Sequence, residues 1–204
     1  ETGCDQFDKA TTKSNIENKI VLKVKKLLLR DNKFFKFIAR KTKKAGYKIF
    51  GETEKVIRSG NWYGNDTVWR MCLDLNKILF YGEADGKLNP GKRKKYFCVV
   101  DGINSMEGNG PQAGSCRNDG LIISGINPVA VDALCATVMG FDYKKIPLIK
   151  NSFEEKEFPL ADFTYEDITC VSNDERFNKN AADIKYEDTL KYEPHFGWKG
   201  HIDI

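Results

Sequence analysis

The sequence lacks several patterns by which catalytic and metal sites are usually recognised. No two of its six cysteines are close enough to form a CxxC pair, so no zinc ribbon or iron–sulfur cluster is expected from their spacing. It has neither a Gly-x-Ser-x-Gly elbow nor a His-Glu-x-x-His motif. It also has no run of the ~20 apolar residues that would span a bilayer. Four of the thiols lie in apolar runs, which favours buried, reduced cysteines in a cytoplasmic protein.

The composition predicts a folded protein with an uneven charge. Hydrophobic residues make up 41% of the 204 residues, enough for a core in one large domain or two small ones. Lysine and arginine are concentrated between Lys13 and Lys48, where only Glu17 and Asp31 oppose them. Apolar residues at near-helical spacing in the same stretch predict a basic amphipathic helical hairpin. We therefore expect a basic helical segment at 1–60, acting as an insertion or cap, and an α/β domain at 61–204.

The basic hairpin leaves two interpretations open. Its Lys19–Lys48 part could bind an acidic surface, an anionic membrane or another polyanion. Alternatively, it is a solvated helical face whose long lysine stems lie beside a soluble core.

From residue 61 onward, short apolar runs alternate with helical patterns. Helices are expected at 67–81, 127–140 and 142–151, and strands at 95–100, 121–124 and 168–171. Asn127 and Pro128 are a typical helix start, and Gly140 a typical stop. The helix after Thr67 is apolar around most of its circumference, so we expect it to be largely buried. The alternation predicts an α/β fold with a mainly parallel sheet and flanking helices.

The best candidate site is the polar stretch from Asp101 to Pro111. Asp101 follows a predicted buried strand, and ligands of open α/β sheets bind beyond the carboxyl ends of strands. Asp101 and Glu107 are the candidate catalytic residues, or the carboxylates that would hold a divalent metal such as Mg²⁺. The helix starting at Asn127 should point its N-terminus at the same edge and favour a small anionic ligand. The competing interpretation is an ordinary turn, because Asp-Gly and Gly-Pro are common turn pairs.

Other polar residues are expected to complete a ligand-binding set. A narrow polar stripe on the first helix of the α/β domain should face either a polar site or a structural network. Glycines near Glu107 would let backbone approach a ligand closely. The candidate ligand-binding residues are Asn65, Asp66, Arg70, Asp74, Gly108, Asn109, Gly110, Asn127 and Asp132. His195 and His201 could serve as a base or metal ligand, although such tails more often pack structurally.

Three blocks carry a family resemblance: Gly60–Asn76, Val100–Pro111 and Asn127–Gly140. Together they resemble the family known as domain of unknown function 362, in a form linked with bacterial polysaccharide-related gene neighbourhoods. The resemblance implies an α/β domain of a bacterial cytoplasm. It also implies a longer N-terminal part, so we expect the chain to be a fragment. Some relatives carry ferredoxin-like cysteine clusters, which this sequence lacks, and no catalytic residues carry over.

Two functions follow from these observations. The first is an enzyme or binding domain for an anionic, phosphorylated or sugar-linked small molecule, with a carboxylate-bound divalent metal. The second is a non-catalytic module that binds a polyanion or an anionic membrane through its basic helices. The sequence does not identify the reaction, the metal or the oligomeric state.

Overall fold

The computed structural model describes residues 61–111 and 113–204. The chain divides into two units, residues 1–65 and 66–204, and every helix and strand of the described residues lies in the second. The expected basic hairpin and its Lys19–Lys48 surface lie outside the described residues, so the predicted 1–60 segment stays a prediction. No helix of the described part is both long and apolar enough to cross a membrane.

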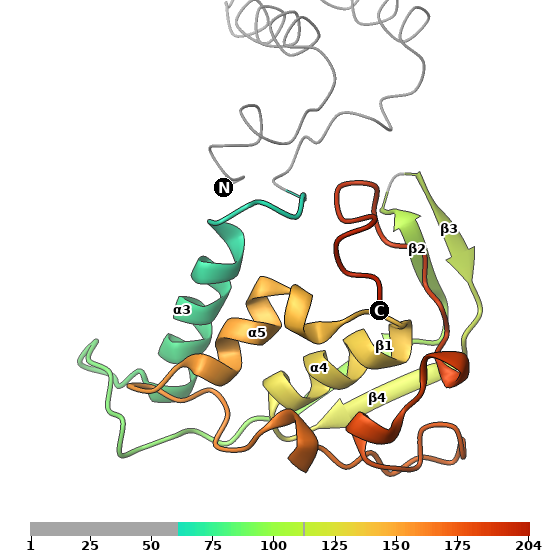
Figure 1. The fold of residues 1–204 in the computed structure, drawn as a ribbon. Helices are drawn as coiled ribbons and strands as arrows, with labels where there is room; N and C mark the ends of the chain where they lie inside the picture. Colours follow the sequence, from blue (N-terminus) through green and yellow to red (C-terminus); the bar gives the residue numbers. More distant parts are fainter. Residues whose placement is uncertain (1–60, 112) are drawn as a thin grey trace, which may run out of the picture. The chain divides into compact units, whose positions relative to one another are not determined.

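Helix α3 (Val68–Tyr81) begins and ends close to where its sequence pattern predicted. It packs on α5 (Pro147–Glu154), as Figure 1 shows. Its C-terminal end is held by the Tyr81 hydroxyl, which donates to the Pro159 carbonyl at 2.6 Å. Its buried residues are Leu73, Phe80 and Tyr81. The expectation of a largely buried helix is wrong, because four apolar side chains on its other side are exposed: Met71, Leu75, Ile78 and Leu79.

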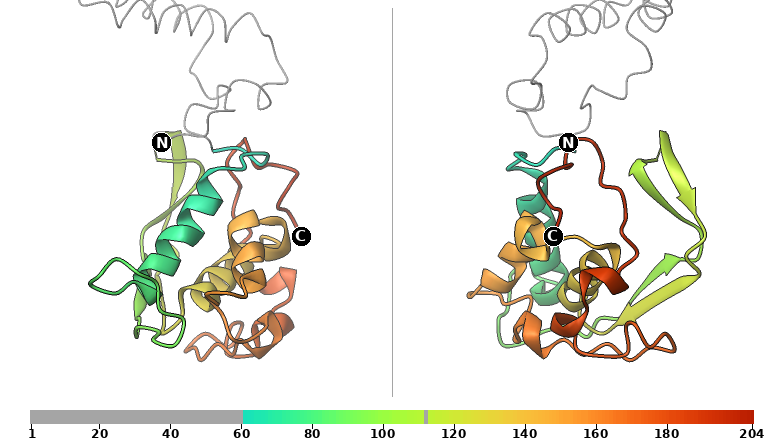
Figure 2. Two further views of the ribbon diagram at one scale, coloured as in Figure 1. Left: turned by 90° about the vertical axis from the view of Figure 1, so that its left-hand side faces the viewer. Right: turned by 45° about the vertical axis from the view of Figure 1, so that its right-hand side comes forward.

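Four short strands form one bent, two-stranded ribbon, which we call the β-ribbon. Strand β1 (Cys98–Gly102) pairs with β4 (Leu121–Gly125), and β2 (Ser105–Asn109) pairs with β3 (Ala113–Arg117). Both pairings are antiparallel. Figure 2 shows the bend where β1 passes into β2 and β3 into β4.

The β-ribbon corrects the predicted sheet. The described residues are a mixture of helices and strands, as expected, but a mainly parallel sheet is wrong for them. The stretch after Asp101 was expected to be a loop leading to the next parallel strand. Instead it is a hairpin that folds the chain back on itself, which makes its neighbours antiparallel.

Helix α4 (Pro128–Met139) confirms the predicted boundaries. The Asn127 side chain accepts hydrogen bonds from the backbone N–H of Val129 (2.8 Å) and Ala130 (3.2 Å). Gly140 ends the helix with φ at 89°, a left-handed conformation that glycine adopts without strain. The helix packs against β4, and its residues form much of the larger hydrophobic core.

Beyond α4 the chain is mostly short turns. The 142–151 prediction is divided into a single 3₁₀ turn (Tyr143–Lys145) and α5, which Pro147 begins. Further 3₁₀ turns follow at Tyr165–Asp167, Ala181–Asp183 and Tyr186–Asp188. The strand expected at 168–171 is only an isolated bridge between Thr169 and Asn180. Side chains of these turns and of the segments between them, including Tyr165 and Phe177, complete the core under α4.

Replacing Asn127 with alanine should destabilise the unit. The change removes two capping bonds and the bond from the Asn127 amide to the Leu160 carbonyl (2.9 Å). We expect a loss of about 2 kcal/mol in the free energy of unfolding, measured by urea denaturation. Asn89→Ala is the control, because Asn89 is exposed and its side chain accepts only from the Gly91 N–H of its own turn; a loss as large in that variant would contradict the assignment.

Candidate functional site

The structure separates the two parts of the site expected around Asp101. Cys98 pairs with Gly125 and Gly102 with Leu121. Asn127 therefore lies at the end of the β-ribbon where β1 begins, whereas Asp101 lies toward the end where β1 finishes. Asp101 is exposed, and its carboxylate accepts a hydrogen bond from the Ile103 N–H at 3.0 Å. The N-terminus of α4 does not face Asp101, because the strand between them runs antiparallel.

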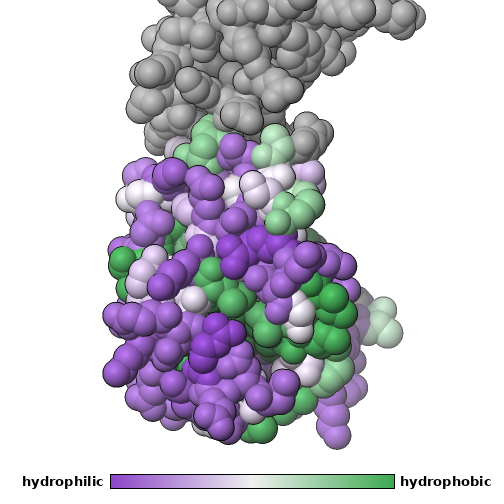
Figure 3. Space-filling model, turned by 90° about the vertical axis from the view of Figure 1, so that its right-hand side faces the viewer, coloured by the Kyte–Doolittle hydropathy of each residue, from purple (hydrophilic) through white to green (hydrophobic). Residues whose placement is uncertain are grey.

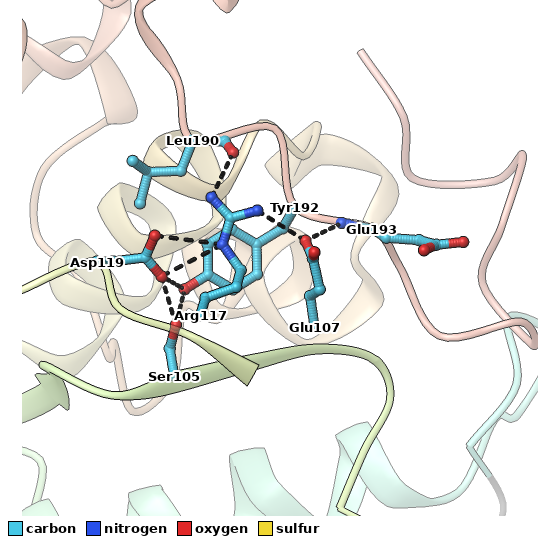
Figure 4. Close-up of polar contacts among 7 residues, drawn as sticks. All are labelled: Ser105, Glu107, Arg117, Asp119, Leu190, Tyr192 and Glu193. Atoms are coloured by element: carbon cyan, nitrogen blue, oxygen red, sulfur yellow. Dashed lines mark hydrogen bonds and ion pairs between the residues drawn. The ribbon is translucent and has the colours of Figure 1, made fainter. Parts of the chain in front are cut away.

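Glu107 belongs to a different group of side chains, which we call the clasp: Ser105, Glu107, Arg117, Asp119 and Tyr192. Figure 4 shows Arg117 at its centre, between the two carboxylates. Arg117 donates to Glu107 at 2.9 Å and to Asp119 at 3.2 Å. The hydroxyls of Ser105 and Tyr192 also donate to Asp119.

The clasp fastens the C-terminal segment (residues 190–196) to the β-ribbon. Arg117 donates to the Leu190 carbonyl at 3.0 Å and lies over the Tyr192 ring, 4.4 Å from its centroid. Glu107 accepts from the Glu193 N–H at 2.9 Å. Every charged group of the clasp is thus bonded to another part of the chain, which is the pattern of a structural network.

The clasp also determines the protonation states of Asp119 and Tyr192. Burial raises the pKa of Asp119, but hydrogen bonds from Ser105, Tyr192 and Arg117 outweigh it and hold that pKa below its ordinary value. Burial, together with the neighbouring Asp119 carboxylate, raises the pKa of the Tyr192 hydroxyl. Asp119 therefore stays charged and Tyr192 neutral at neutral pH, the states that these hydrogen bonds require.

The tip of the β-ribbon is occupied by the same C-terminal segment. The Gly108 N–H donates to the Glu193 carbonyl at 2.8 Å, and the Asn109 side chain accepts from the Phe196 N–H at 3.2 Å. Gly110 follows at the turn, in a cis peptide bond to Pro111. The predicted ligand-binding residues of this turn thus meet the histidine-containing tail. His195 packs on Phe196, and burial lowers its pKa.

The polar stripe of α3 lines a groove between α3 and α5, with a volume of about 420 Å³. Arg70 pairs with Asp66 at 2.9 Å, and Lys77 lies 3.5 Å from Asp74. Lys77 also forms a 2.5 Å ion pair with Glu155, and that hydrogen bond raises the pKa of Lys77 and lowers the pKa of Glu155. The positive and negative groups of this groove largely pair with one another.

Two further predicted residues, Asn65 and Asp132, take part in none of these groups. Asn65 is buried, and its backbone N–H donates to the Trp62 carbonyl at 3.1 Å. Asp132 is an exposed residue of α4. The protein atoms around its carboxyl group nevertheless reduce its hydration, and this raises its pKa. It neighbours the thiols of Cys98 and Cys135, and burial raises the pKa of Cys135 to about 12, which leaves that thiol unreactive.

A larger groove, with a volume of about 780 Å³, lies along the N-terminal half of α4. We call it the basic groove. Ala130, Val131 and Leu134 form one wall, and a stretch including Phe163 and Ile168 forms another. Basic, acidic and uncharged polar side chains line its remaining edge: Arg93, Lys94, Lys95, Ser124, Asn127, Asp162, Asp167 and Thr169.

The sequence interpretation missed this groove, except for Asn127. Lys92, Arg93, Lys94 and Lys95 are consecutive and directly precede an apolar strand, so the charge run was visible. The sequence does not associate this run with a groove, because the residues that lie opposite it, between 162 and 169, are remote in sequence.

No group of three or more His, Cys, Asp or Glu side chains in the described part of the chain is arranged to hold a metal ion. Asp101 and Glu107 in particular do not converge, since Asp101 caps its own turn and Glu107 is bonded to Arg117.

The described unit defines a small α/β protein with an antiparallel β-ribbon and an open groove beside a capped helix. The profile of the family described as "Domain of unknown function (DUF362)" matches residues 11–137, and the chain belongs to that family. No curated protein and no solved structure matches the chain.

Replacing Arg117 with methionine should release the C-terminal segment while leaving the core folded. Methionine keeps an apolar stem but loses the bonds to Glu107, Asp119 and Leu190. Amide exchange across 190–196 should quicken by on the order of tenfold, while exchange in α4 is unchanged.

Arg176→Met is the matched control for hydrogen exchange, because Arg176 bonds only to the nearby Asp174 side chain and lies outside the clasp. Equal exchange at 190–196 in the two variants would show that the clasp does not hold the segment.

Proposed function

We propose that the basic groove binds a small amphipathic anion. The observation that carries the proposal is the combination of a groove of about 780 Å³ with apolar walls and an edge of consecutive basic residues. Small-molecule sites are typically concave, mostly apolar and furnished with a few polar groups that orient the ligand.

The charges at the groove support an anion. Arg93 is already engaged, since it donates to the Leu160 carbonyl at 2.7 Å and lies 3.5 Å from Asp162. Lys94 and Lys95 have no ion-pair partner among the described residues. Both are exposed, so their ammonium groups remain available to a ligand.

The acidic groups at the groove are committed elsewhere. Asp162 faces Arg93, whereas Asp167 accepts hydrogen bonds from the backbone N–H and hydroxyl of Thr164, at 2.8 and 2.9 Å. These hydrogen bonds lower the pKa of Asp167 and fix it as the cap of its own turn. The groove is lined by three basic side chains, Arg93, Lys94 and Lys95, and by two acidic ones, Asp162 and Asp167, so a net positive charge remains.

The walls support an apolar part of the ligand. Ala130 and Leu134 lie one turn apart on the same side of α4, and Phe163 and Ile168 face them across the groove. An apolar body placed there would lose contact with water, while an acidic group reached Lys94 and Lys95. A phosphorylated or sugar-linked metabolite with an apolar part has this chemistry. The proposal is for binding, and it places the ligand beside α4 instead of at Asp101 and Glu107.

Binding is testable with the fluorescent probe anilinonaphthalene sulfonate, which joins an aromatic body to one sulfonate. Reversing the charge at both lysines, in Lys94→Glu/Lys95→Glu, should weaken probe binding by about tenfold or more. Each change removes an attraction to the sulfonate and adds a repulsion. Titration of the 204-residue chain, followed by fluorescence, measures the dissociation constant. Ala130→Phe should also weaken binding, because a larger side chain narrows the groove.

Lys150→Glu is the matched control, since Lys150 is an exposed lysine on α5 outside the groove. A neutral probe, N-phenylnaphthylamine, should respond to Ala130→Phe but much less to the lysine reversals. Unchanged binding of the sulfonate probe in both groove variants would contradict the proposal.

A further inference from the structure

The outer face of the β-ribbon is apolar and exposed. Phe97 is 66% exposed, Val99 58%, Ile122 63% and Ile126 80%. An antiparallel sheet with one side on a core normally presents polar side chains on its other side. Figure 3 views the molecule from the side on which the β-ribbon lies and shows hydrophobic residues gathered in one continuous area.

The register places these side chains on one face. Val99 pairs with Ser124 and Asp101 with Ile122, and paired residues point to the same side of an antiparallel sheet. Phe97 and Ile126 each lie one position beyond the Cys98–Gly125 pair. Because side chains alternate along a strand, both lie on the same face as Val99. We call this set the outer face.

A run of basic residues adjoins the same end of the outer face. Lys92, Arg93, Lys94 and Lys95 closely precede Phe97. Arg93 is bonded to the fold, and Lys92 lies 3.2 Å from Glu83, whereas Lys94 and Lys95 are exposed and have no such partner among the described residues. The acidic group of the face, Asp101, lies toward the opposite end of β1.

We propose that the outer face docks on an anionic membrane surface, with Phe97 and Ile126 in the headgroup boundary and Lys94 and Lys95 on lipid phosphates. Charge complementarity favours this partner, because basic residues beside exposed apolar ones match the interfacial region of an anionic bilayer. The long lysine stems reach past the apolar side chains to charged headgroups.

The inference goes beyond the proposed function, and the two can be tested apart. The 204-residue chain is sedimented with vesicles of phosphatidylcholine and phosphatidylglycerol, or with vesicles of phosphatidylcholine alone. Binding is expected for the anionic vesicles and should fall steeply as salt is raised. Ile122→Asp, on the outer face but outside the groove, should weaken vesicle binding by about tenfold or more and leave sulfonate-probe binding unchanged.

Val171→Asp is the matched control, because Val171 is 90% exposed and lies outside the outer face. Circular dichroism of each variant shows whether the fold is retained, and Phe97→Ser provides a second, milder change on the same face. Equal binding of neutral and anionic vesicles would overturn the proposal, as would an equal effect of Ile122→Asp and Val171→Asp. Self-association that Ile122→Asp abolishes, without vesicle binding, would also overturn it and assign the face to a second copy of the chain.

Discussion

The antiparallel register of β1 and β4 is the constraint on which the rest of the described unit depends. Because Cys98 lies opposite Gly125, the chain leaves β4 beside the start of β1 and enters α4 there. Asn127 can then cap α4 and bond Leu160 with the same side chain. That arrangement places the N-terminal half of α4 beside Lys94 and Lys95 and so builds the basic groove.

The part of the β-ribbon beyond β1 and β4 explains why the unit needs its clasp. Beyond Gly102 the β-ribbon bends and continues as β2 and β3 (Figure 2). A two-stranded ribbon has little stability of its own in water. Arg117 joins it to the C-terminal segment by donating to the Leu190 carbonyl, 73 positions away, while its bonds to Glu107 and Asp119 hold the guanidinium in place on the ribbon side.

The sequence predicted well what local interactions decide. The start of α4 was predictable from Asn127 and Pro128 and its end from Gly140, because caps depend on neighbouring backbone groups. Strand direction was not predictable, since the apolar run ending at Val100 is compatible with a parallel or an antiparallel partner. The strands β2 and β3, which read Ser-Met-Glu-Gly-Asn and Ala-Gly-Ser-Cys-Arg, show no clear apolar alternation and were therefore assigned to a loop.

At the candidate site, too, the sequence indicated individual residues but not which residues meet in space. Glu107 was predicted as a catalytic residue or a metal ligand from its place in the polar stretch, whereas in the structure its carboxylate pairs with Arg117 across the ribbon. The walls of the basic groove come from 93–96, 124–134 and 162–169, and only tertiary folding brings them together. The basic run at 92–95 was visible in the sequence, but its significance depends on the apolar groups that lie beside it in space.

The basic groove and the outer face meet at Ile126, Lys94 and Lys95, and this shared edge has a physical consequence. Apart from Ile126, which belongs to both, their apolar parts lie on different elements: α4 and the stretch with Phe163 and Ile168 for the groove, and the outward side of β1 and β4 for the face. A substitution on one of these separate apolar parts therefore tests one surface alone, whereas a change of the lysines affects both. Since the same two ammonium groups would serve a soluble anion or a lipid phosphate, occupation of the groove by an anion should reduce the attraction of the outer face to an anionic surface.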